Sequence, residues 1–316
     1  MPSSLGGRCH ADTMPTNAQW TDLLDPDEAA LRSAWPDGIH ATALTALLQP
    51  AAHEDEPRPK LEGHGSYVFG SLLVPVAVPA EDRVYYQEVV LLLTDHQVLT
   101  VRKTPPHGVP LDVTGTQETC RHGMPAGMIA YHLLDQVAEG YLDLVDDLHA
   151  EIDELEDNVE AWTNDQVRVR LSDLRHDLLH IRRTLAPTRD AVRRVMDDRV
   201  DLDNGELFPR EVELHFGDAY DKLLRATEGL ETARDLIAGV RDYHQSKVAN
   251  DQNEVMKRLT VIASILLLPT FIVGLYGQNF DVIPELHWAQ GYGFSWALII
   301  SSTLVQLWYF RRKRWI

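Results

Sequence analysis

The chain has 316 residues, with 29 Lys and Arg against 48 Asp and Glu and a formal net charge of −19. This acidic balance excludes nucleic acid as the expected partner, because phosphate binding needs a basic face. Cys9 and Cys120 lack the spacing of a zinc site or a redox pair. Residues 1–18 contain no apolar core, so they are predicted to form a disordered tail rather than a signal peptide.

Residues 19–126 are expected to form a small α/β unit. The segment 20–50 carries turn and cap signals that predict a short helical region. The stretches 67–78 and 84–101 are rich in Val, Tyr and Leu, which predicts strands, and Thr94 to Gln97 suit a hairpin turn within the second stretch.

Residues 127–207 predict an antiparallel helical hairpin, because apolar residues recur at three and four from Leu142 to Trp162 and from Leu171 to Leu185. The first helix carries ten acidic residues and no basic ones between 139 and 160, whereas the second is rich in arginine. Opposite charges on consecutive helices favour pairing. Most of the acids are expected to form a solvated face, with a nearby divalent cation as the alternative.

Residues 208–276 predict one continuous helix. Pro209 suits its first turn, and no proline follows until Pro269. Such a helix would be about 100 Å long. A stalk of this length needs partners to bury its apolar stripe, so we expect the chain to form oligomers.

Two uncharged segments, 259–276 and 291–310, approach the roughly 20 residues that cross a bilayer as a helix. The alternative, two buried helices of a soluble core, explains less well two such runs joined by a short loop. The membrane part of the first helix is expected at about 256–276.

Basic residues predict the orientation of these helices. Lys257 and Arg258 precede the first, the basic tail 311–316 follows the second, and the loop 277–290 contains no Lys or Arg. By the positive-inside rule, both termini should be cytoplasmic and the loop external. The predicted fold is therefore an α+β cytoplasmic domain on a stalk that continues into a two-helix anchor, in a multi-pass protein of the cell (inner) membrane.

One face of the first membrane helix has a regular pattern. Residues at spacings of three or four form a mostly apolar stripe with a polar residue at each end: Asn253, Met256, Leu259, Ala263, Leu267 and Thr270. Taken alone, this stripe is explained by ordinary helix packing.

The stretch "NEVMKRLTVIASILLLPTFIVGLYGQNF", followed by "PELHW" and "YFRRKRWI", closely resembles the C-terminal third of the CorA-type divalent-cation transporters. The resemblance implies a funnel-shaped homopentamer, a pore lined by the first membrane helix, and Mg²⁺ as the usual ion. The six-residue stripe would then line the pore, where its apolar middle could exclude water and rings of Asn253 or Thr270 could hold hydrated ions.

The residues Gly277, Gln278 and Asn279 are expected to form the outer mouth of this pore. Mg²⁺ dehydrates reluctantly, so a selective mouth should offer neutral oxygens to its water shell. Gly277 is expected to adopt a positive φ and turn the chain sharply. Asp281 and Glu285 would add a negative field that concentrates cations.

Two departures from the family pattern bear on this mouth. Gln278 replaces the usual methionine of a Gly-Met-Asn motif, and Pro269 stands one place later than usual. Some relatives with another residue in the middle of the motif are associated with zinc, so the choice among Mg²⁺, Zn²⁺, Co²⁺ and Ni²⁺ stays open.

The resemblance also implies a regulatory site. Asp218 aligns with a family carboxylate that binds Mg²⁺ between subunits, and Asp221 shares its helix face. Val78 stands where the partner acid is expected, so Glu81 and Asp82 are predicted as substitutes. Asp242 matches an acidic family position at the cytoplasmic pore entrance.

The predicted function is membrane-potential-driven uptake of divalent cations, most simply Mg²⁺, closed by cytoplasmic divalent-ion binding between subunits. One alternative is a Zn²⁺ or Co²⁺ transporter on the same scaffold, possibly proton-coupled. Another is a membrane-anchored coiled-coil scaffold without transport. No nucleophile–base arrangement or phosphate-binding loop stands out, so no enzyme is predicted. His176 and His180 have a zinc-compatible spacing but no third ligand, and ordinary helix surface is expected there.

Overall fold

The computed structural model describes residues 17–315 except 37–38, 40–43, 45–46, 49–56, 79–82, 106, 121–122, 204–206 and 280–282. The predicted tail 1–18 lies outside the described residues apart from its last two. The chain forms two compact units, Met1–Val240 and Arg241–Ile316.

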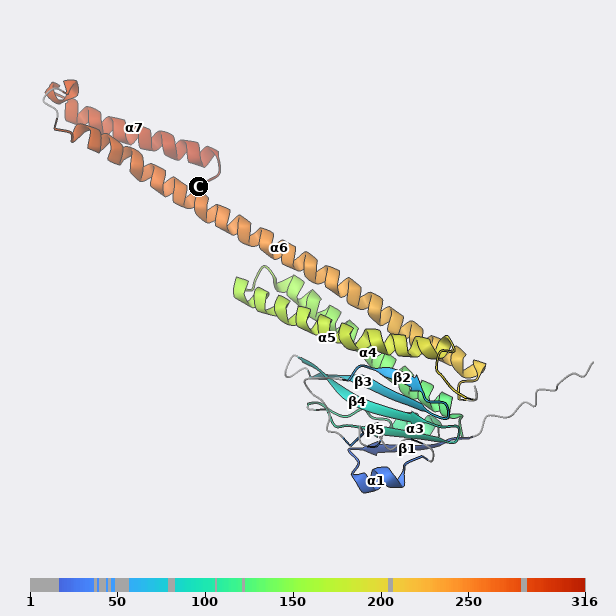
Figure 1. Ribbon diagram of the computed structural model, residues 1–316. Coiled ribbons are helices and arrows are strands. Elements are labelled where there is room, and N and C mark those ends of the chain that lie inside the picture. The colour runs from blue at the N-terminus through green and yellow to red at the C-terminus, as the bar shows by residue number, and fades with distance from the viewer. Residues whose placement is uncertain are drawn as a thin grey trace, which may run out of the picture. The chain divides into compact units, whose positions relative to one another are not determined.

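The first unit contains a five-stranded sheet (Figure 1). Its strands are β1 (Gln19–Leu24), β2 (Lys60–Gly63), β3 (Val68–Val78), β4 (Arg83–Leu93) and β5 (Gln97–Arg102), in the spatial order β1-β5-β4-β3-β2. The β1–β5 pair is parallel and all other pairs are antiparallel. The predicted strands and their hairpin turn before Gln97 are confirmed.

The prediction of a helical region over 20–50 is wrong at its start, where the chain forms β1, and the short α1 (Glu28–Ser33) follows. The physical reason is a distant partner. The Trp20 indole donates to Thr100 Oγ1 at 3.0 Å, and Arg102 lies 2.6 Å from the Asp22 carboxylate. The short strand β2 was also not predicted.

Helices α3 (Thr114–Cys120), α4 (Ala126–Asn158) and α5 (Asn164–Met196) belong to the same unit. The predicted helical hairpin is confirmed as α4 and α5, and Thr163 caps α5 in a capping box with Gln166. The α4 helix packs on the sheet, where the Tyr141 hydroxyl donates to the Leu73 carbonyl at 3.0 Å. That carbonyl lies beyond the reach of the short β2, so Tyr141 supplies the hydrogen bond that a longer edge strand would make.

Helix α6 (Arg210–Tyr276) is the single long helix that the sequence predicts. In the first unit its buried residues alternate at spacings of four and three: Val212, Phe216, Ala219, Leu223, Ala226, Leu230, Ala233, Ile237 and Val240. They belong to the same core as α4 and α5. The expectation that this stripe needs other subunits is therefore wrong for residues 212–240, because the same chain buries it.

The second unit contains the rest of α6, the 3₁₀ turn η1 (Pro284–His287) and α7 (Gly291–Arg312). Helix α7 runs back along α6 (Figure 1), and Gln306 Nε2 donates to the Ser264 carbonyl at 3.2 Å. Both helices are long and apolar enough to cross a membrane. Only 11% and 6% of the residues in their most apolar stretches are buried, which is far less than a soluble core helix would bury.

Candidate functional site

The apolar end of α6 presents two opposite faces. One face contains the buried Val261 and Ile272 and the half-buried Ile265 and Leu268. The Ser264 carbonyl on this side accepts from Gln306 of α7, so α7 lies along this face. The other face, about 180° away at 100° per residue, holds the predicted pore-lining residues. All of these are exposed: Asn253, Met256, Leu259, Ala263, Leu267 and Thr270.

This exposed face is apolar in its middle and polar at its ends. Met256, Leu259 and Leu267 are 59%, 58% and 71% exposed. The Thr270 hydroxyl donates to the Leu266 carbonyl at 2.7 Å, which leaves its oxygen lone pairs free to accept from water. The structure thus brings the six predicted residues onto one uncovered helix face.

The predicted mouth follows directly at the end of α6. Gln278 and Asn279 are exposed, and the Gly277 N–H donates to the Val273 carbonyl at 2.9 Å. Gly277 has no positive φ, so the expectation of a left-handed turn there is wrong. The glycine instead leaves room for the helix end, since a Cβ would lie 3.1 Å from the Val273 oxygen. Of the two loop acids, Glu285 is half-buried in η1, whereas Asp281 lies outside the described residues.

The predicted regulatory acids are spread along α6. Asp218 and Asp221 are both exposed, and neither forms an ion pair with any of the described residues. Asp242 pairs with the neighbouring Arg241 at 2.9 Å. Glu81 and Asp82 lie outside the described residues, so the structure does not test whether they approach Asp218. Within the described part of the chain, no three acidic, His or Cys side chains are grouped as a metal site.

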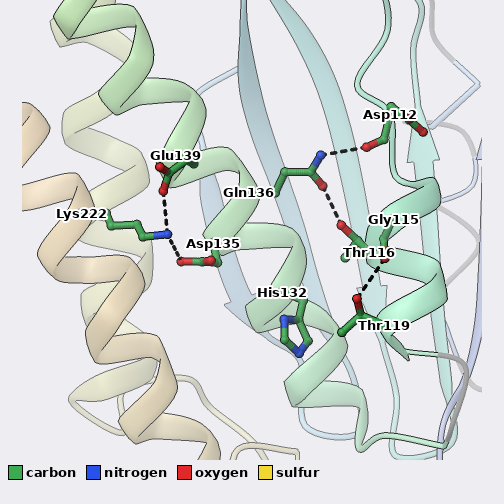
Figure 2. A pocket seen from close by; sticks show the side chains of 9 residues that line it. All are labelled: Asp112, Gly115, Thr116, Thr119, His132, Asp135, Gln136, Glu139 and Lys222. Atoms are coloured by element: carbon green, nitrogen blue, oxygen red, sulfur yellow. Dashed lines mark hydrogen bonds and ion pairs between the residues drawn. The ribbon is translucent and has the colours of Figure 1, made fainter.

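A polar hollow of about 560 Å³ lies between α3, α4 and Lys222 of α6 and was not predicted (Figure 2). Lys222 of α6 lies 2.9 Å from Asp135 Oδ1 and 2.7 Å from Glu139 Oε2, both on α4. Asp135 and Glu139 are four apart on one helix face, so a single ammonium group can join them. The sequence offers no local signal for this contact, because helix packing brings Lys222 over from 83 positions beyond Glu139.

The wall opposite Lys222 is held by hydrogen bonds that join α4 to α3 and to Asp112 just before α3 (Figure 2). The Thr116 hydroxyl donates to Gln136 Oε1 at 2.9 Å, and Gln136 Nε2 donates to the Asp112 carbonyl at 2.8 Å. Burial alone would lower the pKa of Lys222, but the hydrogen bonds to Glu139 and Asp135 and the negative charges of these two carboxylates together outweigh it and raise the pKa. The ammonium group therefore stays charged and acts as a fixed cation between the two carboxylates.

His132 also lines this hollow. Burial lowers its pKa below the usual 6.5, and the nearby His215 adds to the lowering, whereas Asp135 opposes it. Burial likewise raises the pKa of the adjacent Tyr131, with smaller contributions from the negative charges of Asp135 and Asp218. The contact between α4 and α6 thus combines an ion-paired lysine with an imidazole that favours its neutral form.

Comparison with known proteins identifies what the chain is similar to. Residues 17–312 match the family described as CorA-like Mg²⁺ transporter protein. The cobalt/magnesium transport protein CorA of Thermotoga maritima is 31% identical over 283 residues, which cover 88% of this chain and 77% of that protein.

A solved structure and a more distant relative extend the comparison. The complete structure of the CorA magnesium transporter from Methanocaldococcus jannaschii covers 94% of this chain and 91% of its own, with a TM-score of 0.75 and 24% identity, so it supports the fold alone. The zinc transport protein ZntB of Yersinia pseudotuberculosis is 28% identical over 58% of this chain and 56% of its own length.

The depressed pKa of His132 predicts a pH dependence of stability. A folded-state pKa below 6.5 means that the unfolded chain binds the proton more tightly, so stability is fully present above pH 6.5 and falls as the pH drops below it. His132→Gln should flatten this acid-side loss. The measurement is thermal unfolding of the detergent-solubilised protein across this pH range. His96→Gln, at an exposed position in the β4–β5 turn, serves as the matched control. Identical pH profiles for the two variants would contradict this role for His132.

Proposed function

The chain belongs to the CorA-like Mg²⁺ transporter family, and on that premise we propose that it mediates passive uptake of divalent cations, with Mg²⁺ as the main substrate. The observation that carries this proposal is the uncovered face of α6 opposite α7, which leads directly into Gly277, Gln278 and Asn279. A face that is exposed in one chain, mostly apolar and polar at both ends suits the wall of a shared pore.

In the proposed assembly, five copies place this face around one axis. The value five rests on family resemblance. From Asn253 to Thr270 the face extends about 25 Å along the helix. Its methionine and leucine side chains would form a constriction that closes by excluding water, and the polar residues at its two ends would hold hydrated ions.

The proposed mouth selects by hydration. Mg²⁺ usually keeps several waters, so amide and carbonyl oxygens of Gly277, Gln278 and Asn279 would accept hydrogen bonds from those waters instead of displacing them. We propose that Asp281 and Glu285 raise the local cation concentration.

The membrane potential supplies the driving force. With the termini cytoplasmic in the cell (inner) membrane, a divalent ion moving inward gains about 4.6 kcal/mol per 100 mV, which favours accumulation by roughly a thousandfold. We propose that cytoplasmic Mg²⁺ limits this flux by binding between subunits at Asp218 and Asp221, with Glu81 and Asp82 as the partner acids, and that Asp242 stands at the cytoplasmic entrance of the pore.

Two rival functions are retained. The ZntB similarity and Gln278 favour a second candidate, transport of Zn²⁺ or Co²⁺ on the same scaffold, with or without proton coupling. A membrane-anchored scaffold without transport would predict no metal flux at all.

Asn279→Ala is expected to lower Mg²⁺ flux roughly tenfold or more, since it removes one hydrogen-bonding amide per subunit from the mouth. The measurement is Mg²⁺ uptake into proteoliposomes under a potential that is negative inside. Gln290→Ala removes an exposed amide elsewhere in the same loop and should leave the flux unchanged. If the wild-type protein transports no divalent metal, the transport proposal is wrong and a membrane-anchored scaffold without transport is favoured.

Gln278→Met tests the choice of ion. If the middle residue of the motif sets selectivity, this variant should raise the ratio of Mg²⁺ to Zn²⁺ flux relative to the wild type. Uptake of Mg²⁺, Zn²⁺ and Co²⁺ is measured separately, with and without a pH gradient. A wild-type preference for Zn²⁺ that requires the pH gradient would overturn the Mg²⁺ assignment in favour of the proton-coupled rival.

Asp218→Asn is expected to weaken closure by internal Mg²⁺. Loss of a carboxylate ligand should raise the internal Mg²⁺ concentration needed for half-maximal inhibition about tenfold or more. Vesicles are loaded with graded Mg²⁺, and uptake of a tracer metal is followed. Asp235→Asn neutralises another exposed acid of α6 and should match the wild type. Equal inhibition curves for the two variants would rule out Asp218 as a regulatory ligand.

A further inference from the structure

The C-terminal end of α7 is held by a complete backbone cap. The Arg314 N–H donates to the Arg311 carbonyl at 3.1 Å, and the Trp315 N–H donates to the Phe310 carbonyl at 3.0 Å. These two bonds form a Schellman motif, and the Trp315 ring stacks on Phe310 with centroids 5.7 Å apart, which supplies its usual hydrophobic contact. The tail after α7 therefore has a defined conformation.

Arg314 occupies the position in this cap that normally belongs to glycine. Its φ of 56° lies in the left-handed region, which disfavours residues with a Cβ. Its side chain is exposed and makes no ion pair with any described residue. Glycine would adopt this backbone conformation at a lower cost in free energy than arginine does. We infer that the positive charge of Arg314 has a function other than stabilising the fold.

Arg314 is part of a larger basic surface, which we call the basic collar. Gln306 contacts Ser264, Lys313 lies seven residues after Gln306, and Lys257 lies seven residues before Ser264. Because α7 runs back along α6, these two lysines lie at a similar level, about 10 Å along each helix from the contact. The collar comprises Lys257, Arg258, Arg311, Arg312, Lys313 and Arg314.

The collar is almost free of compensating acids. Arg258 pairs with Glu254 at 2.6 Å, whereas the other five basic side chains have no acidic partner within the described residues. This contrasts with the whole chain, whose net charge is −19. The positive charge is therefore local and available to an external anion.

Aromatic side chains place the collar at the edge of the apolar surface. Trp308 and Tyr309 are 61% and 50% exposed, in the last turns of α7. The Arg312 guanidinium lies 5.5 Å from the centre of the Trp308 ring, within cation–π range. Exposed Trp and Tyr at the end of a membrane helix sit at the level of the lipid headgroups, so the arginines next to them reach the phosphates.

We propose that the basic collar binds the headgroups of anionic phospholipids. This inference rests on the membrane placement in the proposed function. Guanidinium groups match phosphate oxygens in a bidentate manner, and the exposed Leu304 and Leu307 just before the collar offer a surface for the acyl chains. A lipid satisfies both the charged and the apolar part of this surface, whereas free phosphate satisfies only the charged part.

The test uses full-length protein in neutral detergent, with phosphatidylglycerol or phosphatidylcholine of identical acyl chains added. Native mass spectrometry measures the lipid bound. The wild type should bind phosphatidylglycerol more tightly than phosphatidylcholine. Arg314→Gly, which suits the left-handed position and keeps the cap, should weaken that binding roughly fivefold. Arg314→Lys retains the charge but not the bidentate guanidinium, so it should weaken the binding less than Arg314→Gly does. Combined Arg311→Gln, Arg312→Gln and Lys313→Gln should weaken it further.

Three outcomes would overturn the proposal: equal binding of the two lipids, an Arg314→Gly variant that binds phosphatidylglycerol as the wild type does, or full competition by glycerol phosphate alone. Metal flux through the same preparations in proteoliposomes separates the two claims. If the protein conducts metal but shows no preference for phosphatidylglycerol, only the proposed lipid site is contradicted. A protein that shows the preference but conducts nothing sinks only the transport proposal.

Discussion

The structure depends on one uninterrupted helix, α6, whose first part is packed in a protein core and whose last part is apolar and exposed. An α-helix satisfies almost all of its backbone polar groups within itself, so α6 can leave a packed core and enter an apolar medium with the loss of only the hydrogen bond that Pro269 cannot donate. Only the pattern of its side chains needs to differ between the two parts of the helix. Up to Val240 they form a stripe with alanine at every seventh residue (Ala219, Ala226 and Ala233), and this stripe is buried in the core shared with α4 and α5. Beyond Val240 most of the helix surface is exposed.

The elements that could be predicted from sequence are those whose signal is local. The helices α4, α5 and α6 repeat a periodic pattern over many turns, and β3 to β5 form a hairpin series of Val- and Leu-rich strands. The missed elements depend on distant partners. Strand β1 exists because Trp20 and Asp22 meet Thr100 and Arg102 across about 80 positions, and no window around residue 20 contains that information.

The candidate site shows the same division. Spacing alone places Asn253 to Thr270 on one face, and the structure leaves that face uncovered. The contact of Lys222 with Asp135 and Glu139 depends on how α6 packs against α4. The spacing of the two acids indicates only that they share a helix face and could bind a cation, and it does not identify Lys222 as that cation. Gly277 illustrates a different limit. Glycine was expected there because it tolerates a left-handed φ, whereas the structure shows no positive φ and instead a Val273 oxygen that a Cβ would approach closely.

The burial of residues 212–240 by their own chain also changes the physical argument for assembly. An apolar stripe that is already covered requires no second subunit, and exposed leucines between 259 and 267 would be satisfied by lipid. The polar residues are what lipid does not satisfy: Asn253 and the amides of Gln278 and Asn279 need water or another chain. Because α7 covers the opposite face of α6, its arginines lie on the side of α6 away from that polar path. The packing of α7 on α6 therefore places the polar path and the arginines of α7 on different sides of one helix, so the first can face a cation while the second face an anionic surface.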